Sequence, residues 1–333
     1  MFTQKKSSLH RWTHSLGGEE AVLEDTMTIT LKNEKYEVVL NTHGAEINAF
    51  RGKDGTQYVF EGPESVWKFH APVLFPHVGR IRDGFYTWQE KEFHLVNNGM
   101  SRDMEHKIIE QSEKTATFEL TENAETADKF PWKFSLKTHY ELTDTGLLFT
   151  TTVTNTDKTT MYFSLGSHTA FCCPRNTDPA GTTNADYQYE FEKKEPLTTV
   201  LLNDAAQLAV DEDGTAPCTK AYGEKDAGII PIGADGFGNG HFFTHFTSNW
   251  VGLRNKKDGS LVKVNCAGYP YLMVWQGGNG KDGASGNGFN CIEPWYGTAD
   301  AENTDHRWEH KSGLIELEPG KSFTADQSIC IEK

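Results

Sequence analysis

The strongest constraint on the fold is a run of alternating residues at positions 132–142 of this 333-residue chain. From Trp132 to Leu142 every second residue is apolar or aromatic, with a single threonine among them. A period of two places these side chains on one face of an extended strand. Turn residues at 143–146 then lead into a second apolar run at 147–153. The two runs predict a β-hairpin.

Similar runs recur along the chain, at 27–31, 36–40, 115–120, 161–165, 241–246, 260–264, 269–275 and 323–331. No long segment has the period of a helix. Many strands joined by glycine-rich turns, without alternating helices, predict an all-β protein built as an antiparallel sandwich or barrel. Because no linker or break in composition divides the strands, we expect residues 1–25 to be an extension and residues 26–333 to be one domain.

Charge and cysteine content restrict the partners. The chain has 32 basic and 47 acidic residues and a formal net charge of −15, which disfavours nucleic acid and anionic membrane as partners. A small neutral substrate fits this balance. The six cysteines show no CxxC spacing, so we expect reduced thiols. No signal peptide or membrane span is recognisable, which predicts a cytoplasmic protein. We expect a monomer or a homodimer.

Glu293 is the first candidate for catalysis. It lies between an apolar run and Pro294-Trp295, with no Lys or Arg beside it in sequence, so we expect it at the end of a buried strand. Burial without a neighbouring cation raises the pKa of a carboxyl group and makes it a better proton acceptor. The alternative is a structural carboxylate paired with a distant arginine.

His168 is the second candidate. It follows a predicted strand and is flanked by small residues, which leave its imidazole uncrowded. A single histidine of this kind is more often structural, but with Glu293 it offers an acid and a base for proton transfer without covalent chemistry. Arg80 lies in a tight turn after an apolar segment. Its guanidinium can bind a pair of hydroxyls or form a surface salt bridge.

Patterns that would indicate a cofactor are weak. Residues 278–283 fit GxGxxG, but the loop leads back into a strand instead of into a helix, so we expect no nucleotide. His241 and His245, like His306 and His310, have the i, i+4 spacing of zinc ligands. Neither pair has the accompanying glutamate or a third ligand. We therefore expect no cofactor and no metal.

Several short motifs follow one another along the chain. They are Gly44-Ala45-Glu46, Phe75-Pro76 with Gly79-Arg80-Ile81, Asn98-Gly99-Met100-Ser101-Arg102-Asp103, Gly166-Ser167-His168-Thr169-Ala170-Phe171, Trp275, Cys291-Ile292-Glu293-Pro294-Trp295 and Glu318-Pro319-Gly320. In this order they resemble the aldose 1-epimerase (galactose mutarotase) superfamily, and in particular its LacX-like branch. The segments around His168 and Glu293 are the most specific parts of the resemblance.

The resemblance implies a β-supersandwich of antiparallel sheets with a sugar pocket, and neither metal nor nucleotide. It also implies that His168 is the general acid, Glu293 the general base and Arg80 a ligand of sugar hydroxyls. The other residues expected to bind substrate are Asn98, Asp103, His241 and Trp275.

Two positions depart from the family pattern. The first of the family's two pocket histidines is Asn98 in this chain. The family also has an aspartate that binds sugar hydroxyls shortly before the strand at 243–246. This chain has Asn239, Gly240 and His241 there, with Asp235 upstream. Both changes affect substrate binding more directly than proton transfer.

These features predict an aldose 1-epimerase that interconverts the α and β anomers of a free hexose by acid–base ring opening and closure. Two alternatives remain open. A non-catalytic sugar-binding or sensing protein would tolerate Asn98. A hexose-6-phosphate 1-epimerase would need cations at the pocket mouth, for which Arg80, Arg82 and Arg102 are candidates.

Overall fold

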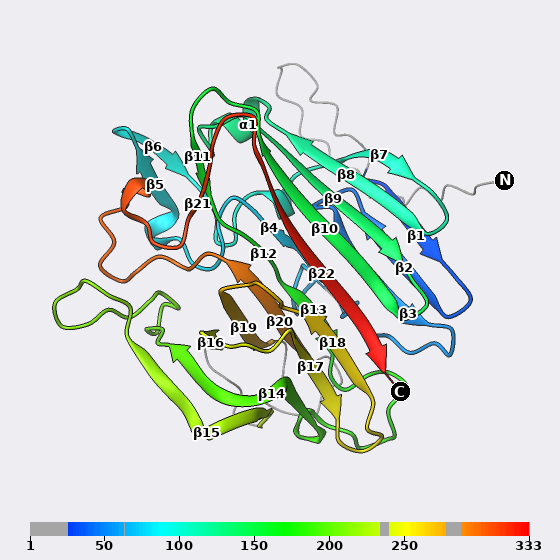
Figure 1. The fold of residues 1–333 in the computed structure, drawn as a ribbon. Coiled ribbons are helices and arrows are strands. Elements are labelled where there is room, and N and C mark those ends of the chain that lie inside the picture. Colours follow the sequence, from blue (N-terminus) through cyan, green and yellow to red (C-terminus); the bar gives the residue numbers. More distant parts are fainter. Residues whose placement is uncertain (1–25, 63, 234–239, 278–287, 333) are drawn as a thin grey trace.

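Most of the molecule is β-strand in the computed structural model, which describes residues 26–62, 64–233, 240–277 and 288–332 (Figure 1). The strands, in chain order, are β1 (Thr28–Lys32), β2 (Tyr36–Asn41), β3 (Glu46–Gly52), β4 (Val73–Leu74), β5 (Phe85–Trp88), β6 (Lys91–His94), β7 (Lys107–Gln111), β8 (Thr115–Thr121), β9 (Phe134–Leu142), β10 (Gly146–Asn155), β11 (Met161–Phe163), β12 (Leu165–Ser167), β13 (Thr169–Cys172), β14 (Tyr187–Val200), β15 (Thr219–Pro231), β16 (His241–Thr244), β17 (Trp250–Asn255), β18 (Leu261–Asn265), β19 (Tyr271–Gly277), β20 (Phe289–Tyr296), β21 (Ile315–Leu317) and β22 (Ser322–Glu332). Helical structure in these ranges consists of α1 (Ala124–Ala127) and the 3-10 turns η1 (Arg82–Gly84), η2 (Ser101–Asp103), η3 (Asn184–Asp186) and η4 (Trp308–His310).

The strands form one large sheet and three small ones. The large sheet has 15 strands in the order β4-β12-β20-β19-β16-β14-β17-β18-β22-β10-β9-β8-β7, with β13 also paired to β20 and β15 to β14. The strand β22 joins its two halves, because it pairs with β10 on one side and with β18 on the other. Every ladder between the strands of this sheet is antiparallel, which confirms the predicted fold class.

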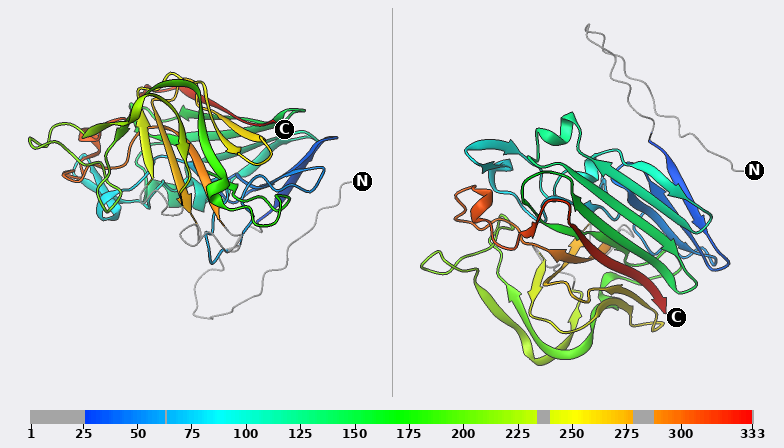
Figure 2. Two further views of the ribbon diagram at one scale, coloured as in Figure 1. Left: turned by 90° about the horizontal axis from the view of Figure 1, so that it is seen from below. Right: turned by 45° about the horizontal axis from the view of Figure 1, so that its top comes forward.

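The three-stranded sheet β1-β2-β3 covers one face of the large sheet and closes the main core (Figure 2). On β1 the burial alternates residue by residue, so that Ile29 and Leu31 point inward. They belong to the same buried cluster as Phe118 of β8 and Tyr140 of β9. The Tyr140 hydroxyl also donates a hydrogen bond to the carbonyl oxygen of Ala45 at 2.7 Å. This pairing of two apolar faces is what defines a sandwich.

The predicted hairpin is present as β9 and β10. Leu142 lies opposite Leu147 in the ladder, and the Thr143 N–H closes the turn on the Gly146 carbonyl oxygen at 2.8 Å. Gly146 is required here, because a Cβ atom would lie 1.9 Å from the carbonyl oxygen of Ile329.

Other strands differ from the sequence-based expectation in their limits. The run at 161–165 is divided into β11 and β12, because the chain changes partner from β21 to β20 at Ser164. The run at 269–275 begins two residues later, directly after Pro270. β14 and β15 were not expected, although Tyr187, Tyr189 and Phe191 alternate with polar residues in β14.

Three further expectations concern the chain as a whole. All six cysteines are free thiols, as predicted. Within the described ranges, no helix is long and apolar enough to cross a membrane. The extension at 1–25 and the glycine-rich pattern at 278–283 lie outside the described residues.

Candidate active site

Strand β20 carries Glu293 in its interior. The strand pairs with β19 along one edge and with β12 and β13 along the other. Glu293 was expected at the end of a strand, but the pairing continues through Trp295 to Tyr296. Because side chains alternate along a strand, Glu293 shares its face with Cys291 and Trp295. Only 1% of the Glu293 side chain is exposed.

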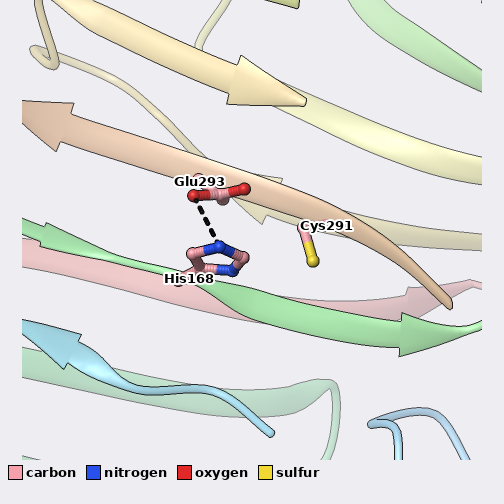
Figure 3. A group of neighbouring side chains, drawn as sticks. All are labelled: His168, Cys291 and Glu293. Atoms are coloured by element: carbon pink, nitrogen blue, oxygen red, sulfur yellow. Dashed lines mark ion pairs between the residues drawn. The ribbon is translucent and has the colours of Figure 1, made fainter. Parts of the chain in front are cut away.

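His168 stands at the junction of β12 and β13, directly beside β20. Its backbone N–H donates to the carbonyl oxygen of Pro72 at 3.1 Å, so the residue leaves the ladder with β20 and turns its side chain toward Glu293. The imidazole Nε2 lies 3.4 Å from Glu293 Oε2. Figure 3 shows the ring facing the carboxyl group across two neighbouring strands. The two residues predicted as acid and base therefore meet in the structure.

A cavity of about 450 Å³ opens over this pair. Its volume is in the range of small-molecule sites, roughly 300–1,000 Å³. Its lining consists of Trp67, Phe69, Gly79, Arg80, Asn97, Asn98, Arg102, His168, Leu202, Ala206, Phe242, Met273, Trp275, Glu293, Trp295 and Ala299. The floor of the cavity is a row of residues that lie opposite one another on neighbouring strands. They are Phe242 on β16, Met273 on β19 and Glu293 on β20.

Aromatic rings surround His168. Its ring centroid lies 5.0 Å from that of Trp67 and 5.8 Å from that of Trp275, which meets it edge-on. Trp275 thus lines the cavity, and both indoles pack against the imidazole.

Burial sets the protonation of the central pair. It raises the pKa of the Glu293 carboxyl well above its usual range. It also lowers the pKa of His168 to about 3, with a further contribution from the positive charge of Arg102. For this pair burial therefore favours a protonated carboxyl and a neutral imidazole. Within the described residues, neither Glu293 oxygen, nor Nδ1 of His168, nor Nε1 of Trp295 has a hydrogen-bond partner.

Two asparagines hold the turn that carries Arg80. The Asn98 side-chain oxygen accepts the Gly79 N–H at 2.7 Å, and the Asn97 side-chain oxygen accepts the Ile81 N–H at 3.0 Å. Asn98 has a positive φ of 65°, which asparagine tolerates better than most residues. Arg80 is exposed, and its guanidinium forms neither a hydrogen bond nor an ion pair with the described residues. Arg80 and Asn98 both line the cavity.

Asp103 does not line the cavity. Its carboxylate lies 3.0 Å from Lys68 Nζ and 3.4 Å from Arg102 Nε. Arg102 itself lines the cavity, with its guanidinium carbon 4.2 Å from the centre of the Phe69 ring. We expected Asp103 to contact the sugar, but its carboxylate pairs with Lys68 and Arg102 and does not line the cavity.

His241 also lies away from the cavity, for a reason of register. It is opposite Val274 on β19, and Val274 is opposite Ile292 on β20. Val274 and Ile292 belong to the main core, so this row points to the face opposite the row of Phe242. His241 packs against Tyr222, with 5.0 Å between ring centroids. Asp235 and Asn239, the other candidates for the hydroxyl ligand, lie outside the described residues.

One group in the described part of the chain could hold a metal ion. His168, Cys291 and Glu293 each offer a donor atom, and these atoms lie within 4.8 Å of one another. Burial raises the pKa of the Cys291 thiol, as it does for Glu293, so both keep protons that a metal ligand must lose. This donor set fits acid–base chemistry better than a resident cation.

Among the described residues, neither spaced histidine pair belongs to a group that could hold a metal ion. His306 stacks on Phe85 at 4.2 Å between ring centroids, whereas His310 pairs with Asp305 at 2.7 Å.

Several lining residues were not predicted as site residues. Trp67 and Phe69 lie in a connection without strand periodicity, and their only signal is a local density of aromatic residues. Asn97 precedes the Asn98 motif and Met273 alternates with Trp275 along β19, so both could have been inferred from neighbours.

Comparison with known proteins identifies the family. Residues 27–330 match the model of the family described as aldose 1-epimerase. The chain belongs to the aldose 1-epimerase family. It is 29% identical over 300 residues to the plasmid-encoded protein LacX of Lactococcus lactis subsp. lactis, covering 88% of this chain and 95% of that one. Membership in the family supports an epimerase or isomerase activity in carbohydrate metabolism.

Two solved structures have the same fold. A galactose mutarotase related enzyme from Lactobacillus acidophilus is 29% identical with a TM-score of 0.82, over 92% of this chain and 98% of that chain. A galactose mutarotase-like protein from Lactobacillus casei is 26% identical with a TM-score of 0.79, over 92% of this chain and 100% of that chain. The supersandwich implied by the sequence motifs is thus confirmed.

The raised pKa of Glu293 predicts that this carboxyl destabilises the ligand-free protein at neutral pH. The folded state keeps a proton that the unfolded chain releases above about pH 4.5, so stability falls as pH rises above that value. Glu293→Gln removes this loss. We expect its melting temperature to exceed that of the wild type by at least about 2 °C at pH 8, with a smaller difference at pH 4.

Glu195→Gln is the matched control. Burial alone would raise the pKa of Glu195, but hydrogen bonds from Ser248 and Thr247 lower it, so this variant should be less stable than the wild type at pH 8. A melting-temperature difference for Glu293→Gln that does not change with pH would contradict the assignment.

Proposed function

We propose that the protein is an aldose 1-epimerase that interconverts the α and β anomers of a free hexose. The observation that carries the proposal is the His168–Glu293 pair, 3.4 Å apart in a cavity of about 450 Å³. Ring opening needs one proton removed from the C1 hydroxyl and one delivered to the ring oxygen. Two adjacent groups that share one proton suit this exchange.

In this proposal Glu293 is the base and His168 the acid. The carboxyl must first be ionised, although burial favours its protonated form. Sugar hydroxyls that donate to the two unpartnered Glu293 oxygens would stabilise the carboxylate and lower its pKa. The proton then resides on His168, which passes it to the ring oxygen. After rotation about the C1–C2 bond, reclosure reverses both transfers.

The cavity walls supply orientation. Trp67 and Trp275 are placed to pack on the apolar face of a sugar, and Arg80 presents an unpaired guanidinium to its hydroxyls. General acid–base assistance contributes about 10²–10⁴-fold, and holding the open chain near its reclosure geometry adds to this.

The test is anomer exchange by polarimetry or NMR on freshly dissolved α-glucose and α-galactose. We expect Glu293→Gln to lower kcat at least about 10²-fold while sugar binding stays within about tenfold, because the amide keeps the shape but accepts no proton. Cys291→Ser, on the same strand face but outside the cavity lining, should retain activity. Exchange at the wild-type rate in Glu293→Gln would exclude this base, and wild-type binding without exchange would support a sugar-binding protein.

Asn98→His tests the position where the chain departs from its family. The Asn98 side-chain oxygen accepts the N–H of Gly79, the residue before Arg80. We therefore expect the substitution to raise KM with kcat altered by less than about tenfold. Steady-state exchange kinetics measure both constants. An inactive wild type together with strong exchange in Asn98→His would instead mean that the missing imidazole is essential.

The second candidate substrate is a negatively charged sugar, and the positively charged residues of the cavity favour it. Arg80 and Arg102 line the cavity of a protein with a net charge of −15. Arg102 acts on His168, since its charge adds to burial in lowering the pKa of that imidazole. The ring oxygen that His168 would protonate is bonded to C5, which carries C6. In this second candidate an anion on C6, as in a hexose 6-phosphate, would be bound by Arg102.

Glucose and glucose 6-phosphate distinguish the two substrates. If the phosphate is bound, Arg102→Gln should lower kcat/KM for glucose 6-phosphate by about 10–100-fold, as for loss of a charge-assisted contact, and should leave glucose less affected. Arg82→Gln is the control, because Arg82 pairs with Asp83 outside the cavity lining. Equal losses for both sugars, or no exchange of the phosphate, would leave free hexose as the substrate.

A further inference from the structure

A buried ion pair lies directly behind the turn that carries Arg80. Asp300 Oδ1 is 2.8 Å from Lys311 Nζ, and the two side chains are 8% and 5% exposed. Neither residue lines the cavity, and neither takes part in the proton transfers described above. We propose that Asp300, held by Lys311, is a positioning residue that sets the place of Arg80 and thereby the affinity for the sugar.

Hydrogen bonds connect Asp300 to the backbone at Arg80 and at Arg82. Its carboxylate Oδ2 accepts the backbone N–H of Arg82 at 2.8 Å. Its own backbone N–H donates to the carbonyl oxygen of Arg80 at 2.9 Å. The Nε2 atom of the buried His77 lies 3.1 Å from the same Arg80 oxygen and donates to it. The two peptide groups that follow Arg80 are thus fixed to one carboxylate-bearing residue.

Asp300 also joins this turn to the other wall of the cavity. Its carbonyl oxygen accepts the Leu208 N–H at 2.9 Å, and Leu208 follows the lining residues Leu202 and Ala206. The neighbouring residue Ala299 packs so closely on Gly79 that a Cβ atom there would lie 2.9 Å from Ala299 Cβ. Three segments of the cavity wall therefore converge on Asp300.

The pair is charged despite its burial. Burial alone would raise the pKa of Asp300, but the charge and hydrogen bond of Lys311 lower it, with a further contribution from His77. Burial lowers the pKa of Lys311, and Asp300 opposes this change. A charged pair with little solvent around it resists displacement, because separating the partners would leave a charge both buried and unpaired.

The position of Arg80 depends on this support. Its exposed guanidinium has neither a hydrogen-bond nor an ion-pair partner among the described residues, so the backbone fixes only the position from which the side chain reaches into the cavity. Loosening the backbone should weaken sugar binding and leave the His168–Glu293 pair on the neighbouring strands in place. The predicted signature is a change in KM without a matching change in kcat, and this inference rests on the proposed sugar-binding role of Arg80.

The experiment is a double-mutant comparison of Asp300→Asn and Arg80→Ala. We expect each single variant to raise KM, and the Kd for the sugar, about tenfold with kcat within about threefold. In the double variant we expect no increase beyond that of Arg80→Ala, because Asp300 acts through Arg80. Increases in KM that multiply, or a fall in kcat alone, would overturn the proposal.

A control and a second variant separate positioning from general stability. Asp178→Asn removes another buried carboxylate, paired with Arg175 at 3.4 Å and outside the cavity lining, and should lower the melting temperature without changing KM. Lys311→Met leaves the Asp300 acceptor in place and should reproduce the KM effect if Asp300→Asn does not fold. An unchanged KM in a folded Lys311→Met protein would count against the proposal.

Binding is measured separately by the fluorescence of the cavity tryptophans with glucose and with glucose 6-phosphate as probes. This Kd is independent of catalysis. A wild type that binds without exchange would refute the epimerase assignment and leave the positioning role testable, whereas an Asp300→Asn protein with wild-type Kd would refute the positioning role alone.

Discussion

A carboxyl group buried in the middle of a doubly paired strand is the constraint on which the rest of the site depends. Glu293 cannot turn to solvent without breaking the ladders of β20 with β19 and with β12 and β13. Desolvation therefore favours the uncharged, protonated form of the carboxyl group. The indoles of Trp67 and Trp275 pack against His168, and among the described residues no Lys or Arg pairs with the carboxyl. A cation paired to Glu293 would have made it an ordinary structural carboxylate.

The sequence predicted those features whose signals are local. Alternation at 132–142 and the turn residues that follow were sufficient to predict the β9–β10 hairpin, because a period of two determines which face of a half-buried strand points to the core. Glu293 and His168 were predicted because an uncompensated carboxylate and an uncrowded imidazole can be recognised from their sequence neighbours. Burial and the pairing of β12 and β13 with β20 then bring them together.

The features that were missed depend on partners distant in sequence. His241 was expected in the cavity, but its orientation follows from its register with Val274, and a displacement of one residue exchanges the two faces of a strand. Asp103 was expected to contact the sugar, and its carboxylate is instead engaged by Lys68, 35 residues earlier. Asp300 was not predicted as a site residue, because its contacts with the Arg80 turn are made 218 residues away in sequence.

The alternation along β20 divides its residues between two tasks. Glu293 and Trp295 face the cavity, whereas Ile292 points into the main core with Val274. Adjacent positions on one strand thus meet different structural demands: one set lines the cavity, and the other is held by the packing of the sandwich. Substitutions at Trp295 change the wall of the cavity, whereas substitutions at Ile292 change the packing of the sandwich. For an engineer, the same separation makes β20 and its neighbour β19 a scaffold on which new specificities can be built without redesigning the core.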